Sequence, residues 1–223
     1  RGVWLATARK GRPWMLRRIG ADGAVEATWD AIDQVIQFRE VDRAMLIVGA
    51  RGETGGLFRL SLDTGKVTCL WEGNTEGLAW HAGITFVSEW TRPWSTLLAL
   101  DDEGAVVWRA LAQLPDFHRG RVVAMVPDAG GAQVGCLDAR TGASLWTRAV
   151  DAADPLMYVV GVADLVCVDN GYLDVLRLRD GTPVQRLQEG EPNTWRLDGR
   201  SNRRDRLVVS DMNRILCWER TRD

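Results

Sequence analysis

Short segments that read as hairpins recur about every 40 residues, and each is centred on a glycine between two runs of alternating apolar and polar residues. Only one stretch, 30–38, has an apolar spacing that a helix would also explain. A period of this length with four short strands per repeat is typical of propeller blades. The sequence therefore predicts an all-β fold, a β-propeller of about six four-stranded blades. A seven-bladed ring truncated at both ends is the alternative.

The repeat depends on the turn chemistry. The five turn glycines lie 42, 39, 38 and 39 residues apart. Glycine tolerates the positive φ of a tight hairpin, and Asp or Thr side chains bond back to the turn backbone. We therefore expect a hairpin in each of the segments 16–29, 60–71, 98–108, 136–146 and 176–187, with turns at Gly23, Gly65, Gly104, Gly142 and Gly181.

Tryptophan follows four of the five turns, and leucine takes its place after the last. Each of these residues lies four or six positions beyond the glycine, so the side chains share one face of a strand. We expect the large rings to pack against the neighbouring blade rather than to bind a ligand. The residues are Trp29, Trp71, Trp108, Trp146 and Leu187.

We label the four strands of a blade A to D in chain order, so that each hairpin above joins C to D. The B strands are expected at 3–7, 45–50, 84–88, 122–126, 165–169 and 206–210, where the sequence is apolar on both strand faces. Such runs indicate strands buried on both sides. Weaker A strands are expected around 35–38, 77–81, 114–118, 156–160 and 194–197. The count is six B and six C strands but five A and five D.

No linker or shift in composition divides the chain, so we expect one domain over 1–223. Its blades are expected at about 1–29 (partial), 30–71, 72–110, 111–150, 151–188 and 189–223 (partial). A six-bladed ring that lacks one A and one D strand explains this count. The two strands would come from residues outside this sequence, or the ring would hold two three-stranded blades.

The composition excludes several classes of partner. The formal net charge is −2 and 46% of the residues are hydrophobic, whereas nucleic-acid-binding surfaces show a basic excess. No apolar run reaches the roughly 18 residues that span a bilayer. We expect no nucleic acid partner and no membrane insertion. The chain begins with Arg1 rather than Met, so we expect the natural N-terminus to lie elsewhere.

The four cysteines are too far apart in sequence for a C-x-x-C motif. Cys136 and Cys167 fall in apolar runs, where a free cysteine behaves as a small buried hydrophobe. We expect free thiols rather than a disulfide framework, which favours a reducing compartment. The expected location is the cytoplasm of a bacterium, and the periplasm stays open.

The segment LDARTGASLW (137–146) resembles the repeat of quinoprotein-type (PQQ-like) β-propellers, which read roughly Leu-Asp-x-x-Thr-Gly-x-x-x-Trp. Segments 60–71 and 98–108 are looser copies. The resemblance implies a propeller fold. The quinone-dependent dehydrogenases of this family have eight blades in a much longer chain, with a metal and a cofactor pocket. Other members serve only as protein-binding scaffolds, and the resemblance implies that non-enzymatic branch here.

Motifs for catalysis are sparse. The sequence contains no G-x-S-x-G, H-E-x-x-H or P-loop. His81 and His118 precede a B strand at equivalent points of two repeats, which favours a structural role in the A–B turn. GARGETGG (49–56) lacks the Lys-Ser/Thr and the following helix of a phosphate site, so we interpret it as a flexible B–C loop. We predict no catalytic, cofactor or metal residue, no cofactor, and no enzyme activity.

Two groups of loop residues are candidate binding sites, because B–C and D–A connections share one end of a blade. Exposed tryptophan beside arginine is typical of protein interfaces, and the long B–C loops provide Arg12, Arg51, Glu53, Trp90, Arg92 and Trp94. The D–A segments place acidic and amide groups at the mouth of a central channel, where they could bind a cation or a sugar; these are Asn74, Glu76, Asp154, Glu191 and Asn193.

Two hypotheses for function follow. The first is a noncatalytic protein–protein interaction scaffold or sensor propeller, a module of a larger protein or assembly that binds one or more protein partners. The alternative is a small-molecule-binding or enzymatic propeller that uses its central channel.

Overall fold

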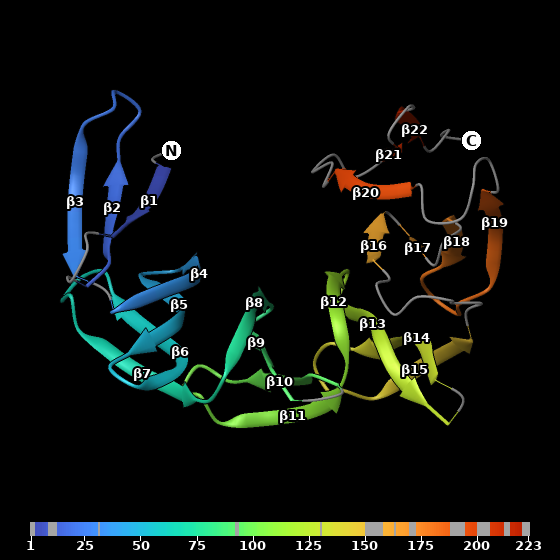
Figure 1. Ribbon diagram of the computed structural model, residues 1–223, viewed down its shortest axis with the longest axis horizontal. Coiled ribbons are helices and arrows are strands. Elements are labelled where there is room, and N and C mark those ends of the chain that lie inside the picture. The colour runs from blue at the N-terminus through green and yellow to red at the C-terminus, as the bar shows by residue number, and fades with distance from the viewer. Residues whose placement is uncertain are drawn as a thin grey trace. The chain divides into compact units, whose positions relative to one another are not determined.

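The computed structural model describes residues 3–8, 13–30, 32–91, 94–129, 131–149, 158–162, 164–169, 173–187, 195–199, 206–211 and 215–219. The described residues contain β-strands and no helix, and the strands form six antiparallel sheets (Figure 1). The prediction of an all-β fold is confirmed. The chain separates into two compact units, Arg1–Arg109 and Ala110–Asp223. The expectation of one domain over 1–223 stays a prediction.

The first unit contains three sheets. The sheets consist of β1 (Val3–Thr7), β2 (Met15–Ile19) and β3 (Val25–Asp30); β4 (Gln34–Val41), β5 (Ala44–Arg51), β6 (Thr54–Ser61) and β7 (Val67–Glu72); and β8 (Thr75–His81), β9 (Ile84–Glu89), β10 (Thr96–Leu100) and β11 (Val106–Leu111). In each sheet, the strands neighbour one another in chain order. Stretch 30–38, which could have been a helix, contributes to strand β4 as predicted.

The second unit has the same order of strands. Its sheets consist of β12 (Gln113–His118), β13 (Arg121–Asp128), β14 (Gly131–Asp138) and β15 (Ser144–Ala149); β16 (Tyr158–Val162), β17 (Leu165–Asp169), β18 (Leu173–Arg177) and β19 (Pro183–Leu187); and β20 (Trp195–Gly199), β21 (Arg206–Asp211) and β22 (Ile215–Glu219). Among the described residues the first sheet holds strands B, C and D and the last holds A, B and C, so the predicted count of five A and five D strands is confirmed.

All five predicted turn glycines join a C strand to a D strand, and their φ angles lie between +68° and +88°. Side-chain oxygens accept hydrogen bonds from the turn backbone, as expected. The carboxylate of Asp138 accepts from the amides of Arg140 and Thr141, and that of Asp101 accepts from those of Glu103 and Ala105. The predicted hairpins are therefore confirmed, and so are the positive φ angles and the hydrogen bonds to the turn backbone that were expected to form them.

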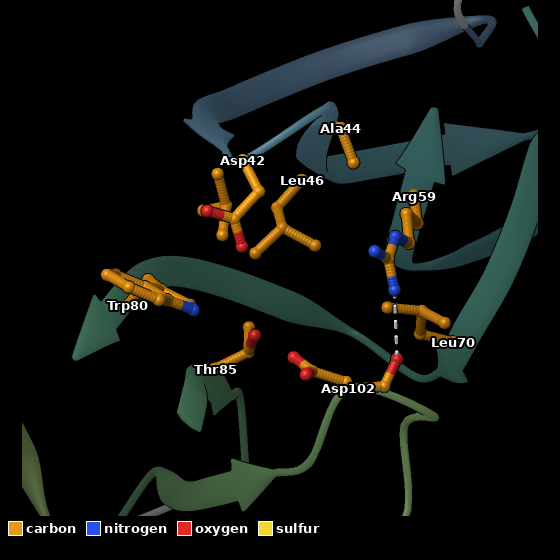
Figure 2. A pocket seen from close by; sticks show the side chains of 9 residues that line it. Asp42, Ala44, Leu46, Arg59, Leu70, Trp80, Thr85 and Asp102 are labelled. Carbon is orange, nitrogen blue, oxygen red and sulfur yellow. Dashed lines mark hydrogen bonds between the residues drawn. The ribbon is translucent and has the colours of Figure 1, made fainter. Parts of the chain in front are cut away.

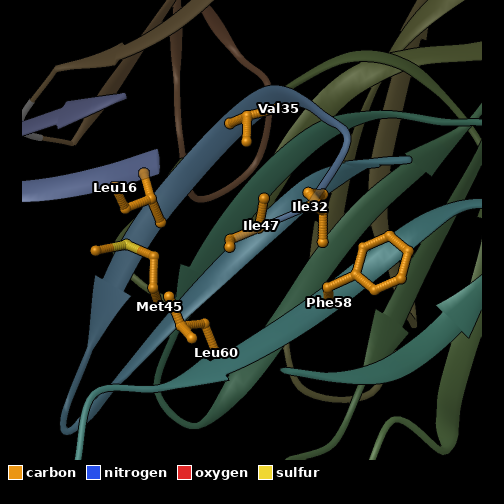
Figure 3. Packing of buried hydrophobic residues seen from close by; sticks show 7 residues of the cluster. All are labelled: Leu16, Ile32, Val35, Met45, Ile47, Phe58 and Leu60. Carbon is orange, nitrogen blue, oxygen red and sulfur yellow. The ribbon is translucent and has the colours of Figure 1, made fainter. Parts of the chain in front are cut away.

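The core lies between sheets, because the B strands are apolar on both faces. Met45 and Ile47 of β5 pack in a cluster with Leu16 of β2 (Figure 3). Leu46 and Val48, on the opposite face of β5, pack in a second cluster that includes strands of the sheet β8–β11. Alternate residues of one strand thus hold two neighbouring sheets.

Strand β1 departs from the predicted burial of B strands. Trp4 and Ala6 pack against the first cluster. Val3 and Leu5 point to the opposite face and are 67% and 47% exposed. The reason is that, in the first unit, the clusters cover only the face of this sheet that meets β4–β7.

Neighbouring sheets of a unit also meet at a recurring seam, in which the D strand of one sheet packs on the C–D turn of the next. A Cβ added to Gly65 would lie 3.7 Å from the ring of Trp29. One added to Gly104 would lie 2.4 Å from the carbonyl oxygen of Leu70, on β7. At Gly104 the seam gives a second reason for glycine, because the neighbouring sheet leaves no room for a side chain, whereas at Gly65 a Cβ would make an ordinary van der Waals contact.

The second unit repeats this seam between β15 and the turn after β18. The ring of Trp146 covers Gly181, where an added Cβ would lie 2.7 Å from it, and its indole nitrogen donates to the carbonyl of Leu178 at 2.9 Å. Arg121 of β13 donates to the same carbonyl at 2.6 Å. The prediction that the tryptophans pack against the neighbouring sheet is confirmed for Trp29 and Trp146. Trp108 packs on Phe86 of its own sheet, and its packing on the following sheet stays a prediction.

Candidate functional site

Three of the candidate loop residues, Trp90, Asn74 and Glu76, lie together at the B–C and D–A end of the sheet β8–β11. The backbone amide of Trp90 donates to the carbonyl of Asn74 at 2.8 Å, and the Ser95 hydroxyl donates to the Glu76 carboxylate at 3.1 Å. The sequence had assigned Trp90 to a partner-binding loop and Asn74 and Glu76 to a channel mouth. The structure brings these residues together in one surface, which we call the Trp90 surface (residues 51–54, 73–76, 89–91 and 94–96).

The loop after β9 is held by its own hydrogen bonds. The Thr91 hydroxyl donates to the carbonyl of Trp94 at 2.5 Å and lies 3.3 Å from the Thr96 hydroxyl. Trp90 is 51% exposed, while Trp94 is only partly exposed. The partial exposure expected of Trp94 is therefore observed. The loop presents the Trp90 ring to solvent on a fixed backbone.

The turn between β5 and β6 corrects one prediction. Segment 49–56 is not a flexible loop: β5 extends to Arg51 and β6 begins at Thr54. Gly52 adopts a φ of +62°. Gly56 lies in β6, where an added Cβ would lie 2.0 Å from the Trp71 carbonyl oxygen. The glycines therefore permit a close approach of β7.

Charge on the Trp90 surface is mostly acidic among the described residues. Arg51, Glu53, Asn74 and Glu76 are exposed. Glu89 lies over Gly73, where an added Cβ would be 2.5 Å from its carboxylate. Sequence reasoning missed Glu89, because it ends an apolar strand and no local pattern marks its contact with the preceding sheet.

Several predicted residues lie outside the described part of the chain. They are Arg12, Arg92, Asp154, Glu191 and Asn193. His81 and His118, in contrast, end β8 and β12, and each is followed by a two-residue A–B turn. Among the described residues, no group of three His, Cys, Asp or Glu side chains is placed to hold a metal ion.

The structure also fixes the state of three thiols. Cys69, Cys136 and Cys167 are free. Burial raises the pKa of Cys167 to about 12, so its reactive thiolate is scarce at neutral pH. Within the described residues there is no helix long and apolar enough to cross a membrane.

No protein-family model and no curated protein sequence matches the chain. Solved structures do. BamB from Moraxella catarrhalis is similar over 98% of this chain and 67% of its own, with 16% identity and a TM-score of 0.61. Hsv2 from Kluyveromyces lactis is similar over 99% and 70%, with 13% identity and a TM-score of 0.69. A europium-containing methanol dehydrogenase is similar over 80% and 48%, with 14% identity and a TM-score of 0.50.

These likenesses and the repeated antiparallel sheets define the chain as a β-propeller protein. BamB and methanol dehydrogenase both have PQQ-like propeller folds, which agrees with the resemblance of segment 137–146. At identities of 12–16% the likeness concerns the fold, and the same fold supports unrelated functions.

Proposed function

We propose that the chain is a noncatalytic protein-interaction module, and that its partner binds the Trp90 surface. The observation that carries the proposal is the exposed Trp90 ring on a backbone tied to Asn74. A large aromatic side chain on a fixed backbone has few torsions to restrict on binding, and tryptophan is enriched among the residues that dominate interface energies.

The rim around this ring supports a protein partner with basic groups. Glu53 and Glu76 are exposed on the same surface, with Arg51 as the described cation beside them. Acidic groups at the rim of an interface guide association with a partner of opposite charge. The proposal also includes a role as part of a larger assembly and, because three thiols are free, a location in a reducing compartment such as the cytoplasm.

The proposal is tested with the variant Trp90→Ala and the control Trp108→Ala. A partner first captured by the wild-type chain is purified, and its affinity is measured by calorimetry. Loss of a central interface tryptophan costs about 2–4 kcal/mol, so we expect Trp90→Ala to weaken binding roughly 30- to 1000-fold with an unchanged melting temperature.

The control separates binding from folding. Trp108 is 9% exposed and its ring lies 5.8 Å from that of Phe86, so Trp108→Ala should destabilise the fold by about 3–5 kcal/mol. A partner that binds wild type and Trp90→Ala with equal affinity would refute the Trp90 surface as the interface.

A further inference from the structure

A cavity of about 30 Å³ lies between the sheets β4–β7 and β8–β11 (Figure 2). It lies at the A–B and C–D turns, the opposite end of these sheets from the Trp90 surface. Its walls are Val41, Asp42, Ala44, Leu46, Arg59, Leu70, Trp80, Thr85 and Asp102. The sequence singled out none of these residues as a site, because they come from six strands and two turns of two blades.

Two hydrogen-bonding groups face this cavity from the sheet β8–β11. The indole nitrogen of Trp80 is buried and has no hydrogen-bond partner among the described residues. Thr85 is 2% exposed, and its side chain points into the same space in Figure 2. A buried N–H without a partner costs about 1–3 kcal/mol. A molecule that enters the cavity and accepts from Trp80 would remove that penalty.

Two acceptors approach from the turns. The carboxylates of Asp42, before β5, and Asp102, after β10, both extend toward the cavity in Figure 2. Arg59 donates to the backbone carbonyl of Asp102 at 3.3 Å, which fixes this turn against β6. The cavity therefore offers an N–H donor and carboxylate acceptors.

This set of groups selects the chemistry of the ligand. A carboxylate or phosphate would face two carboxylates and one cation, Arg59, which already donates to the Asp102 carbonyl. An ammonium group would direct its protons at the Trp80 N–H. A hydroxyl group avoids both conflicts, because its oxygen accepts from Trp80 while its proton is donated to Asp42 or Asp102. The cavity has room for such a group, since a site that holds one water molecule needs at least about 10–15 Å³.

We propose that this cavity is a binding site for a single O–H group, supplied by water or by the hydroxyl of a polyol. The bound group joins the two sheets when it accepts from Trp80 and donates to Asp42. This site is independent of the Trp90 surface, because it lies at the other end of the sheets.

The test uses the whole chain with ¹⁵N-labelled tryptophan, in which each indole N–H gives one NMR signal. Trp80→Phe assigns the Trp80 signal by its loss, and Trp90→Phe assigns that of Trp90, which serves as the exposed reference. Magnetisation transfer from water to each indole is measured first. A titration with glycerol follows.

Each outcome decides the proposal. A long-lived water contact at Trp80, unchanged by glycerol, supports the site with water as its occupant. A saturable shift of the Trp80 signal with glycerol supports it with an alcohol hydroxyl. Thr85→Val, which removes one polar wall, should weaken either effect at least threefold. Without a long-lived water contact or a saturable shift at Trp80, in a wild-type chain whose Trp90 signal behaves as exposed, the proposal is overturned.

Discussion

Thr75 and Thr96 oppose the same residue, Glu89, on the two strands that flank it. The Thr96 hydroxyl lies 3.3 Å from that of Thr91. The Thr75 hydroxyl, on a residue only 3% exposed, has no partner among the described residues. Of these two threonines in mirrored positions, the buried Thr75 therefore has a hydroxyl without a hydrogen bond, and the half-buried Thr96 has one with a hydrogen bond.

This difference predicts opposite effects of the same substitution. Thr75→Val removes an unpaired buried hydroxyl and keeps the shape, so it should raise the free energy of unfolding by about 1 kcal/mol. Thr96→Val breaks a hydrogen bond and should lower it by about 0.5–1.5 kcal/mol. Both are measured by urea denaturation. A Thr75→Val chain less stable than wild type would show that this hydroxyl has a partner.

At the scale of elements, the C–D hairpins depend on aspartates whose charged form is hydrogen-bonded. Hydrogen bonds from Thr182, with a smaller contribution from Arg179, lower the pKa of Asp180 to about 2. Hydrogen bonds from Thr141 lower that of Asp138. These carboxyls bind fewer protons in the folded than in the unfolded chain. Their contribution to stability is therefore complete above the unfolded pKa of about 4 and is lost as the pH falls toward the folded pKa.

The linkage gives a pH-dependent prediction for Asp180→Asn. The variant should be less stable than wild type at neutral pH, and the difference should shrink between about pH 4 and pH 2, because only wild type loses the charged hydrogen bonds there. Thermal melts at several pH values measure this. If the melting temperatures of wild type and Asp180→Asn differ by the same amount at every pH in that range, the prediction is wrong.

These hairpins were predictable because each carries its own signal, a glycine that adopts positive φ beside a side chain that binds the turn backbone. The turn at Gly52 was misinterpreted for the opposite reason: its neighbour Gly56 is required by the approach of β7, which is a contact between strands. The hydrogen bond from Trp90 to Asn74 joins two loops of one blade that sequence reasoning had assigned to different sites. The cavity at Trp80 is completed by Asp42 and Arg59 of the preceding sheet, a contact that arises only when two blades pack. Sequence periodicity therefore predicts the sheets well and the sites between them poorly.

On the scale of the whole molecule, the recurring seam explains how successive sheets of a unit are spaced. Gly23 and Gly104 occupy equivalent turns with φ of +81° and +88°. An added Cβ at Gly23 would meet nothing within 4 Å, whereas at Gly104 it would lie 2.4 Å from the Leu70 oxygen. A side chain would therefore strain the backbone at both positions, but only at Gly104 would it also collide with the previous sheet.

The pair isolates the energy of the seam. Gly23→Ala should cost roughly 1–2 kcal/mol, the penalty of a left-handed alanine. Gly104→Ala should cost about 1–3 kcal/mol more, because β7 must shift to admit the methyl group. Chemical denaturation of both variants measures the difference. Equal losses of stability in the two variants would show that β7 can move to admit the methyl group at no cost.

The seam is also directional, since a D strand meets the turn of the sheet after it and never the reverse among the described contacts of the first unit. Such an interface is heterologous, with two unlike surfaces that complement each other. Within the first unit, Val3 and Leu5 occupy in β1 the positions that Met45 and Ile47 fill in β5, and no sheet of this unit covers them. A heterologous surface of this kind does not satisfy itself in a symmetric dimer. Sheets joined through such a surface add head to tail, which is how one sheet follows another within a unit.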